Sequence, residues 1–201
     1  KYGDAFPGTY DGFKAYTLRK DIKCREESIA HVLYETDPGE QLQFDWKEDI
    51  KIHLKNKKEI AFNVFSATLG YSREHVFIYS LTKTTEDLIR CLIETYRRLG
   101  GVTETAITDN MSAIIAGKNR KINPKVKQLM KDLGVNLKLC KPKVPQTKGK
   151  VEDSNKFVKW IMPYDYELET EEDIINVIEN IIPKQCNSQI NTATKMPPAT
   201  L

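Results

Sequence analysis

Apolar residues gather in three runs in the first half of the chain, and this pattern predicts three neighbouring β-strands. The runs are rich in Val, Ile, Phe and Tyr, which is typical of strands, and they span residues 41–46 with an extension at 51–54, residues 60–69 and residues 75–81. The links at 55–58 and 70–74 are short and polar. Because such links leave no room for a crossover, the three strands are expected to be antiparallel.

The second half of the chain alternates between helical and strand-like patterns. Apolar residues at helical spacing, with start and stop signals, predict helices at 85–99, 125–133, 150–161 and 171–182. Short apolar runs predict strands at 105–108 and 135–140, which should run parallel to the first strand because helices intervene. The predicted fold is therefore α/β, a five-stranded mixed sheet flanked by helices, with the strand at 41–46 away from its edges.

Three carboxylates lie where these elements begin or end. Asp45 closes the run Leu42-Gln43-Phe44, Asp109 follows Ala106-Ile107-Thr108, and Glu152 lies in the first turn of a basic helix. Acids carried in this way can converge at the open end of a sheet, and Mg²⁺ prefers such hard oxygen ligands. Metal held there can cut and join nucleic-acid backbones. The sequence therefore predicts Asp45, Asp109 and Glu152 as metal ligands and catalytic residues.

Each carboxylate also has a plainer interpretation. Asp45 fits a strand cap or an ion-pair partner, and Asp109 fits a turn residue or a helix N-cap. Glu152 fits a solvated acid that complements the helix dipole. The order, element types and spacing of the three acids together favour the metal site.

The net charge of +3 conceals a strong asymmetry along the chain. Residues 118–160 hold thirteen Lys and Arg against three acids, whereas residues 164–179 hold seven acids and no base. Such a basic block fits a solvated face or a site for a polyanion. Because the block flanks two of the predicted metal ligands, we expect phosphate contacts from Lys141, Lys143, Lys148, Lys150, Lys156 and Lys159. On an α-helix, Glu152, Lys156 and Lys159 would project the same way.

Composition sets the remaining expectations. The 201 residues can hold one medium domain plus an appendage, and no apolar run approaches the length of a membrane span, so no membrane partner is expected. The four cysteines and three histidines are scattered, which favours reduced cytoplasmic thiols over a zinc site. The turn at Asp37-Pro38-Gly39 is a natural boundary, and we expect it to divide the tail of a preceding small domain and a linker, residues 1–36, from the main domain, residues 37–163. A C-terminal helix and the start of a following segment occupy residues 164–201.

With these residues in hand, the chain resembles the retroviral-integrase catalytic core of the ribonuclease-H-like superfamily, and more narrowly the IstA-type transposases of bacterial insertion sequences. The resemblance is carried by residues 38–46, Thr108-Asp109-Asn110 and residues 142–152. It implies a DDE triad at Asp45, Asp109 and Glu152 holding two Mg²⁺ or Mn²⁺ ions. It also implies a polynucleotidyl transferase that cleaves at transposon ends and joins them to target DNA. As partners, the resemblance implies further copies of the same chain on DNA and an ATPase helper protein. As location, it implies association with the bacterial nucleoid.

Two of the departures of the sequence from the family pattern concern the predicted site. Asp109 and Glu152 are 43 residues apart, more than in integrases, and residues 111–125 are expected to absorb the excess. Lys47 stands where the family has Gly after the Asp-Trp pair. Two alternative functions stay open, a ribonuclease-H-like nuclease that cuts without joining and a catalytically inactive DNA-binding protein. The three intact acids argue against the second.

Overall fold

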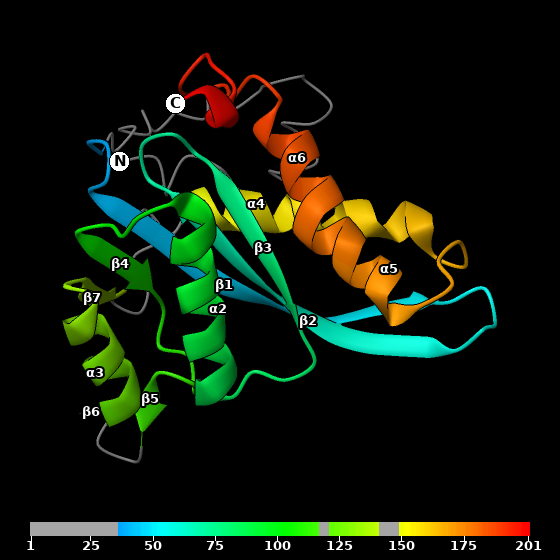
Figure 1. The fold of residues 1–201 in the computed structure, drawn as a ribbon, viewed down its shortest axis with the longest axis horizontal. Coiled ribbons are helices and arrows are strands. Elements are labelled where there is room, and N and C mark those ends of the chain that lie inside the picture. Colours follow the sequence, from blue (N-terminus) through cyan, green and yellow to red (C-terminus); the bar gives the residue numbers. More distant parts are fainter. Residues whose placement is uncertain (1–35, 117–120, 141–148) are drawn as a thin grey trace, which may run out of the picture. The chain divides into compact units, whose positions relative to one another are not determined.

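The computed structural model describes residues 36–116, 121–140 and 149–201, and it describes residues 116 and 149–153 by their backbone only. Its main feature is a five-stranded sheet in the order β3-β2-β1-β4-β7 (Figure 1). The strands are β1 (Gln41–His53), β2 (Glu59–Leu69), β3 (His75–Ser80), β4 (Thr105–Thr108) and β7 (Asn136–Leu139). The first three are antiparallel, and β4 and β7 run parallel to β1. The predicted mixed sheet, with the Asp45 strand at its centre, is confirmed.

Helices flank the sheet on both faces. They are α2 (Thr85–Leu99), α3 (Pro124–Asp132), α4 (Gly149–Val158) with its 3-10 continuation η2 (Lys159–Tyr164), α5 (Glu171–Asn176), the π-helical segment η3 (Val177–Ile181), α6 (Ile182–Asn187) and the short 3-10 turn η4 (Pro198–Thr200). A separate two-stranded ribbon pairs β5 (Ile115–Ala116) with β6 (Lys121–Ile122). This ribbon occupies the segment that was expected to absorb the long spacing between the second and third acids. No helix in the described ranges is long and apolar enough to cross a membrane.

A bulge in β1 lets one strand serve two hydrophobic cores. The register with β2 shifts between Lys47 and Ile50, and Asp49 adopts a positive φ of 53°. Side chains alternate between the two faces of a strand, so this extra residue exchanges the faces. Before the bulge Phe44 belongs to the first core, and after it Ile52 belongs to the second. The polar residues between 41–46 and 51–54, the two predicted parts of the first strand, therefore mark the point where β1 passes from the first core to the second.

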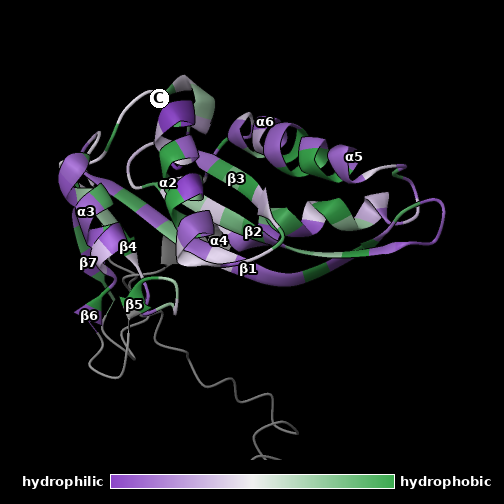
Figure 2. Ribbon diagram, turned by 60° about the horizontal axis from the view of Figure 1, so that its bottom comes forward, coloured by the Kyte–Doolittle hydropathy of each residue, from purple (hydrophilic) through white to green (hydrophobic). Residues whose placement is uncertain are grey.

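The two cores lie on opposite faces of the sheet. The first is formed by β1, β2, β3 and β4 with α2 and α3, and its fully buried side chains include Leu42, Phe44, Phe65, Leu88 and Leu92. The second is formed by the far half of β1 and β2 and by β3 with α4, η2, α5, η3 and α6, and it includes Ile52, Phe62, Phe77, Ile161 and Ile178. Figure 2 shows hydrophobic and hydrophilic residues alternating along α2 and along α5 and α6. Each of these helices therefore presents an apolar stripe to its core.

Helix ends follow the predicted signals at α2 but not at the last helix. Thr84 and Asp87 form a capping box at the start of α2, and Gly100 ends the helix with φ of 72°. The last helix was predicted to end at Ile182, but it continues to Asn187 through Pro183. The predicted helix at 150–161 likewise ends as an α-helix at Val158 and continues as a 3-10 helix.

Pro183 is tolerated because another residue takes over the hydrogen bond that it cannot make. Proline has no N–H, so the carbonyl four residues before it loses its helical donor. That carbonyl belongs to Glu179, and it accepts a hydrogen bond from the Arg98 guanidinium at 3.4 Å. The π-helical turn immediately before Pro183 lets Ile182 donate to Val177 instead. The helix therefore survives the proline through a long-range contact that local sequence patterns do not reveal.

Side chains close the outer edge of β3 against further strand pairing. Asn187 accepts from the His75 N–H and donates to the His75 carbonyl, both at 2.9 Å. Arg90 donates to the Tyr79 carbonyl at 3.2 Å. Exposed edge strands present unpaired backbone groups that can recruit another chain, and here these groups are already bonded.

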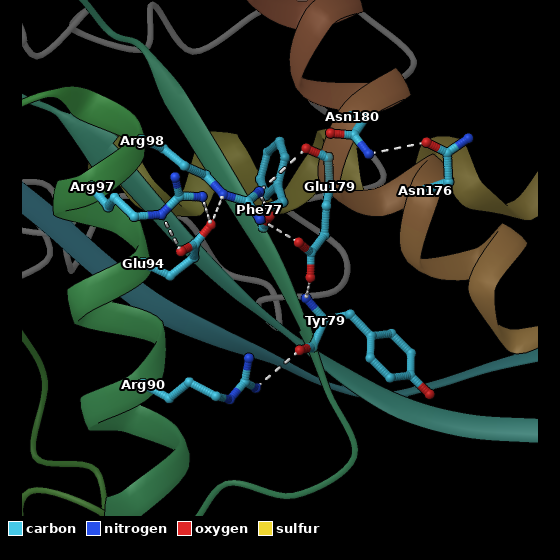
Figure 3. Close-up of polar contacts among 9 residues, drawn as sticks. All are labelled: Phe77, Tyr79, Arg90, Glu94, Arg97, Arg98, Asn176, Glu179 and Asn180. Atoms are coloured by element: carbon cyan, nitrogen blue, oxygen red, sulfur yellow. Dashed lines mark hydrogen bonds and ion pairs between the residues drawn. The ribbon is translucent and has the colours of Figure 1, made fainter.

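Glu179 is the centre of this edge closure (Figure 3). Its Oε1 accepts the Tyr79 N–H at 2.9 Å, and its Oε2 forms an ion pair with Arg98. Arg98 also donates to the Phe77 carbonyl at 3.4 Å and bonds Glu94 at 2.7 Å. Because Arg98 lies on α2 and Glu179 on η3, the pair ties helices from the two layers together across the sheet edge.

Replacing Glu179 with alanine is expected to destabilise the fold and to open the edge of β3. The change leaves the Tyr79 N–H without an acceptor and removes the ion-pair partner of Arg98, a cost of about 1–3 kcal/mol in the free energy of unfolding. Urea unfolding measures this cost, and sedimentation velocity measures any concentration-dependent association. Glu172→Ala, at an exposed acid on α5, is the matched control and should change the free energy of unfolding by less than about 0.5 kcal/mol. Equal midpoints for the two variants would show that the edge closure is not stabilising.

Candidate active site

Asp45 lies on the central strand, on the face of the sheet that carries the second core. It directly opposes Ser66 of β2, which is fully buried, and Asp45 itself is half-buried. The neighbouring residues on the same face of β1 are also polar. Gln41 and Gln43 are both buried, and the Gln43 side-chain amide Nε2 donates to the Gln41 side-chain oxygen Oε1 at 2.9 Å. Asp45 thus belongs to a polar row on a strand whose other face is apolar in this stretch.

The parallel pairing of β1 and β4 brings Asp109 to the level of Asp45. The last paired positions are Gln43 and Ile107, and each acid follows two residues later. Neighbouring strands lie about 4.8 Å apart, so the two acids emerge side by side. Asp109 is half-buried, and its position is fixed on both sides along the chain. The Cys140 N–H donates to the Thr108 carbonyl at 2.8 Å, and the Met111 N–H donates to the Asp109 carbonyl at 2.9 Å.

Helix α4 crosses the same face of the sheet and packs on β1 and β2. Val158 is buried in the second core, and Asn155 accepts a hydrogen bond from the Ser66 hydroxyl at 3.0 Å. Glu152 lies three residues before Asn155, and the structure describes its backbone only. The structure therefore brings Asp45 and Asp109 to the same level of the sheet, and it packs the helix of the third predicted acid on β1 and β2. Within the described ranges no three His, Cys, Asp or Glu side chains form a metal-binding group.

The donor chemistry at this place fits a hard divalent cation. Both described acids supply carboxylate oxygens, which suit Mg²⁺ and Mn²⁺. Of the described thiols, Cys91 lies in the first core and Cys186 in the second, whereas Cys140 is half-buried just beyond β7. Burial raises the pKa of the Cys91 and Cys186 thiols to about 12, which favours their protonated form.

Of the six lysines predicted to contact phosphate, the structure describes the side chains of two. Lys156 is exposed on α4, and Lys159 is exposed at the first residue of η2. The α-helix ends between them, at Val158, so their predicted common face spans two helix types. Lys141, Lys143 and Lys148 lie outside the described residues, and Lys150 is described by its backbone only.

Sequence reasoning missed Ser66 and Asn155 as parts of this site. A weak signal existed in β2, where the residues facing the second core change from apolar Phe62 and Val64 to polar Ser66 and Thr68. The contact between Ser66 and Asn155 joins positions 89 residues apart, so no local pattern could have revealed it.

The sequence is similar to transposases of insertion sequences. It is 33% identical over 173 residues to the putative transposase for insertion sequence element IS5376 of Geobacillus stearothermophilus, covering 83% of this chain and 42% of that protein. It is 36% identical over 138 residues to the transposase for insertion sequence element IS232 of Bacillus thuringiensis subsp. berliner, covering 66% of this chain and 32% of that protein. The chain thus spans less than half the length of both relatives. A comparison with models of protein families gave no match.

The fold is that of retroviral integrase cores. An intasome of simian T-cell lymphotropic virus, solved in complex with a PP2A regulatory subunit, superposes with a TM-score of 0.63 at 15% identity over 82% of this chain and 54% of that chain. The HTLV-2 integrase catalytic core domain, solved in complex with magnesium, superposes with a TM-score of 0.57 at 14% identity over 81% of this chain and 94% of that chain. This chain is therefore a homologue of the insertion-sequence transposases, and its described part has the fold of the retroviral integrase catalytic core.

Proposed function

We propose that this chain is the catalytic core of a DNA transposase that cleaves at transposon ends and joins them to target DNA. The observation that supports the proposal is the register of β1 and β4, which brings Asp45 and Asp109 to one level of the sheet, together with the packing of the helix that bears Glu152 on β1 and β2. Homology to transposases over most of the chain supports the same reaction class. The enzyme would be a polynucleotidyl transferase of the DDE type.

Asp45, Asp109 and Glu152 would hold two ions of Mg²⁺ or Mn²⁺. The oxygen donor set supports this choice, and one integrase core of the same fold was solved with magnesium. When bound, such ions stabilise the charge that develops on the attacking and leaving oxygens of a phosphodiester. The task of the three carboxylates is to hold their oxygens at fixed positions on rigid elements. Glu152 completes the set because helical spacing puts it one turn from Asn155, which already contacts the strand beside Asp45.

The basic side chains around α4 would hold the DNA backbone. Lys156 and Lys159 are exposed next to the proposed catalytic face, and Lys141, Lys143, Lys148 and Lys150 belong to the same basic segment. Lysine acts as a point charge toward phosphate, so these residues would position DNA and would not read its bases.

Assembly and partners follow from the same proposal. Integrase cores of this fold were solved as dimeric and trimeric forms, and one was solved within an intasome, which supports a homo-oligomer on transposon-end and target DNA. An ATPase helper protein and a nucleoid location belong to the proposal through the resemblance to IstA-type transposases. Residues 1–36 would belong to a DNA-binding region that precedes the core.

Asp45→Asn, Asp109→Asn and Glu152→Gln should each reduce Mg²⁺-dependent strand transfer by roughly 1,000-fold or more, because each change removes one charged ligand of the same unit. The assay joins pre-cut transposon ends to a target plasmid. DNA binding should persist in every variant, since a negative charge near phosphate has been removed. Asp132→Asn, at an exposed acid of α3, is the control and should keep normal activity. Near-normal strand transfer by a variant would remove that residue from the triad.

A second assay, which starts from uncut transposon ends and a target plasmid, separates the alternative functions. Metal-dependent cutting of the ends without joining to the target would identify a nuclease and overturn the transposase proposal. Binding of DNA with neither cutting nor joining by the unaltered chain would identify an inactive DNA-binding protein.

Lys156→Gln and Lys159→Gln should each weaken DNA binding on every sequence and lower the salt slope by about one unit, because each phosphate contact releases about one counterion. Fluorescence anisotropy over a range of NaCl concentrations measures the slope. Lys184→Gln, at an exposed lysine of α6, is the matched control and should leave the slope unchanged. A variant with altered sequence preference but an unchanged slope would contradict backbone contact.

A further inference from the structure

The face of the sheet that carries Asp45 is divided into an apolar half and a polar half. Along β2 the residues on this face are apolar up to Val64, and the polar half begins at Ser66. Ser66 is the residue that directly opposes Asp45 in the register of β1 and β2. On β2, the boundary between the second core and the polar half beside Asp45 therefore lies between Val64 and Ser66.

Helix α4 crosses this boundary, and it is anchored differently on the two sides. On the apolar side Val158 is buried in the second core. On the polar side Asn155, one turn earlier, accepts the hydrogen bond from Ser66 at 3.0 Å. Apolar packing is not directional, whereas a hydrogen bond fixes both distance and angle. The Ser66–Asn155 bond is thus a directional anchor between the sheet and the half of α4 nearest the acids.

Because the Ser66 hydroxyl is buried, it depends on the acceptor that Asn155 supplies. Ser66 is 0% exposed, so its hydroxyl has no access to water and needs a partner inside the protein. Asn155 supplies that partner with its side-chain oxygen. A rotation of α4 about its axis, or a shift along it, would leave the buried hydroxyl without an acceptor.

Each of the two bonded residues is a close neighbour of one of the acids. Directly opposed residues on antiparallel strands have Cβ atoms about 4.5–5.5 Å apart, which links Ser66 to Asp45. Residues three apart on a helix are neighbours about 5–6 Å apart, which links Asn155 to Glu152. The hydrogen bond therefore joins β2, the neighbour of the strand that carries the first acid, to the helix that carries the third acid.

We propose that Ser66 and Asn155 form a positioning pair for the metal site, fixing the rotation and height of α4 so that the Glu152 carboxylate meets Asp45 and Asp109. This inference rests on the proposed function. Neither residue contacts metal or DNA in this role. Removal of a residue that orients a metal ligand without contacting the metal typically changes metal affinity by about 10–100-fold. We expect removal of Ser66 or Asn155 to lower the Mn²⁺ affinity by about 10-fold.

The test measures Mn²⁺ binding by electron paramagnetic resonance in the whole chain. Ser66→Ala and Asn155→Ala should each weaken Mn²⁺ binding about 10-fold, and the double variant should be no weaker than either single variant, because both remove the same interaction. Ser66→Thr keeps a hydroxyl and should restore the affinity. Ser80→Ala removes another buried hydroxyl of the same sheet, one bonded to Arg90 at 3.1 Å, and should leave Mn²⁺ affinity unchanged.

Mg²⁺ titration of strand transfer gives a second readout. The Mg²⁺ concentration for half-maximal activity should rise in Ser66→Ala and Asn155→Ala but not in Ser80→Ala. Unchanged Mn²⁺ and Mg²⁺ dependence in folded Ser66→Ala and Asn155→Ala, with only a lower unfolding midpoint, would overturn the positioning role. Additive losses in the double variant would overturn it as well.

If the proposed function itself is wrong, the Mn²⁺ binding measurements give a different result. Asp45→Asn that binds Mn²⁺ as tightly as the unaltered chain would show that the metal site itself is misassigned. Loss of Mn²⁺ binding in Asp45→Asn, together with unaltered binding in Ser66→Ala and Asn155→Ala, would overturn the positioning pair alone.

Discussion

The parallel register of β1 and β4 is the constraint on which the site depends. With Gln43 opposite Ile107, Asp45 lies two residues further along β1, and Asp109 lies two residues further along the chain, just after the end of β4. A shift by one residue would turn one of the acids to the opposite face of the sheet. The register is held from both sides, because β1 also pairs with β2 and β4 also pairs with β7. The centre of the sheet is therefore a rigid base for chemistry that needs oxygen atoms at fixed positions.

The bulge in β1 explains how a polar site can exist on such a strand. Up to Trp46 the strand fills the first core with one face and leaves the other for Gln41, Gln43 and Asp45. After the bulge it fills the second core with the face that had been polar. This lets α4 be anchored by apolar packing at Val158 and by the hydrogen bond from Ser66 at Asn155.

The far edge of the sheet has a complementary role. Arg98 and Glu179 join α2 to η3 around β3, and Asn187 bonds the start of the same strand. The C-terminal helices share the second core with β1 and α4, so their attachment also stabilises the surface on which α4 lies.

Much of this fold was predictable from local patterns, and the misses have physical reasons. Strand directions, the interior position of the first strand and the helix caps follow from alternation, linker length and residues such as Thr84 and Gly100. That Asp45 and Asp109 lie at one level was predictable because both follow apolar runs on parallel strands. The continuation past Pro183 was missed because its support comes from Arg98, 81 residues from Glu179. The Ser66–Asn155 bond was missed for the same reason, since tertiary contacts decide which polar residues meet.

The central claim is that three carboxylates from β1, the end of β4 and α4 converge on one metal site. Anomalous diffraction at the manganese edge, from crystals of the chain grown with Mn²⁺ and transposon-end DNA, tests it most directly. The account predicts anomalous peaks with oxygens of Asp45, Asp109 and Glu152 at roughly 2.1 Å, a bond length typical of such small divalent ions. Peaks bound by other residues, or a Glu152 carboxylate turned away from occupied Asp45 and Asp109, would contradict it.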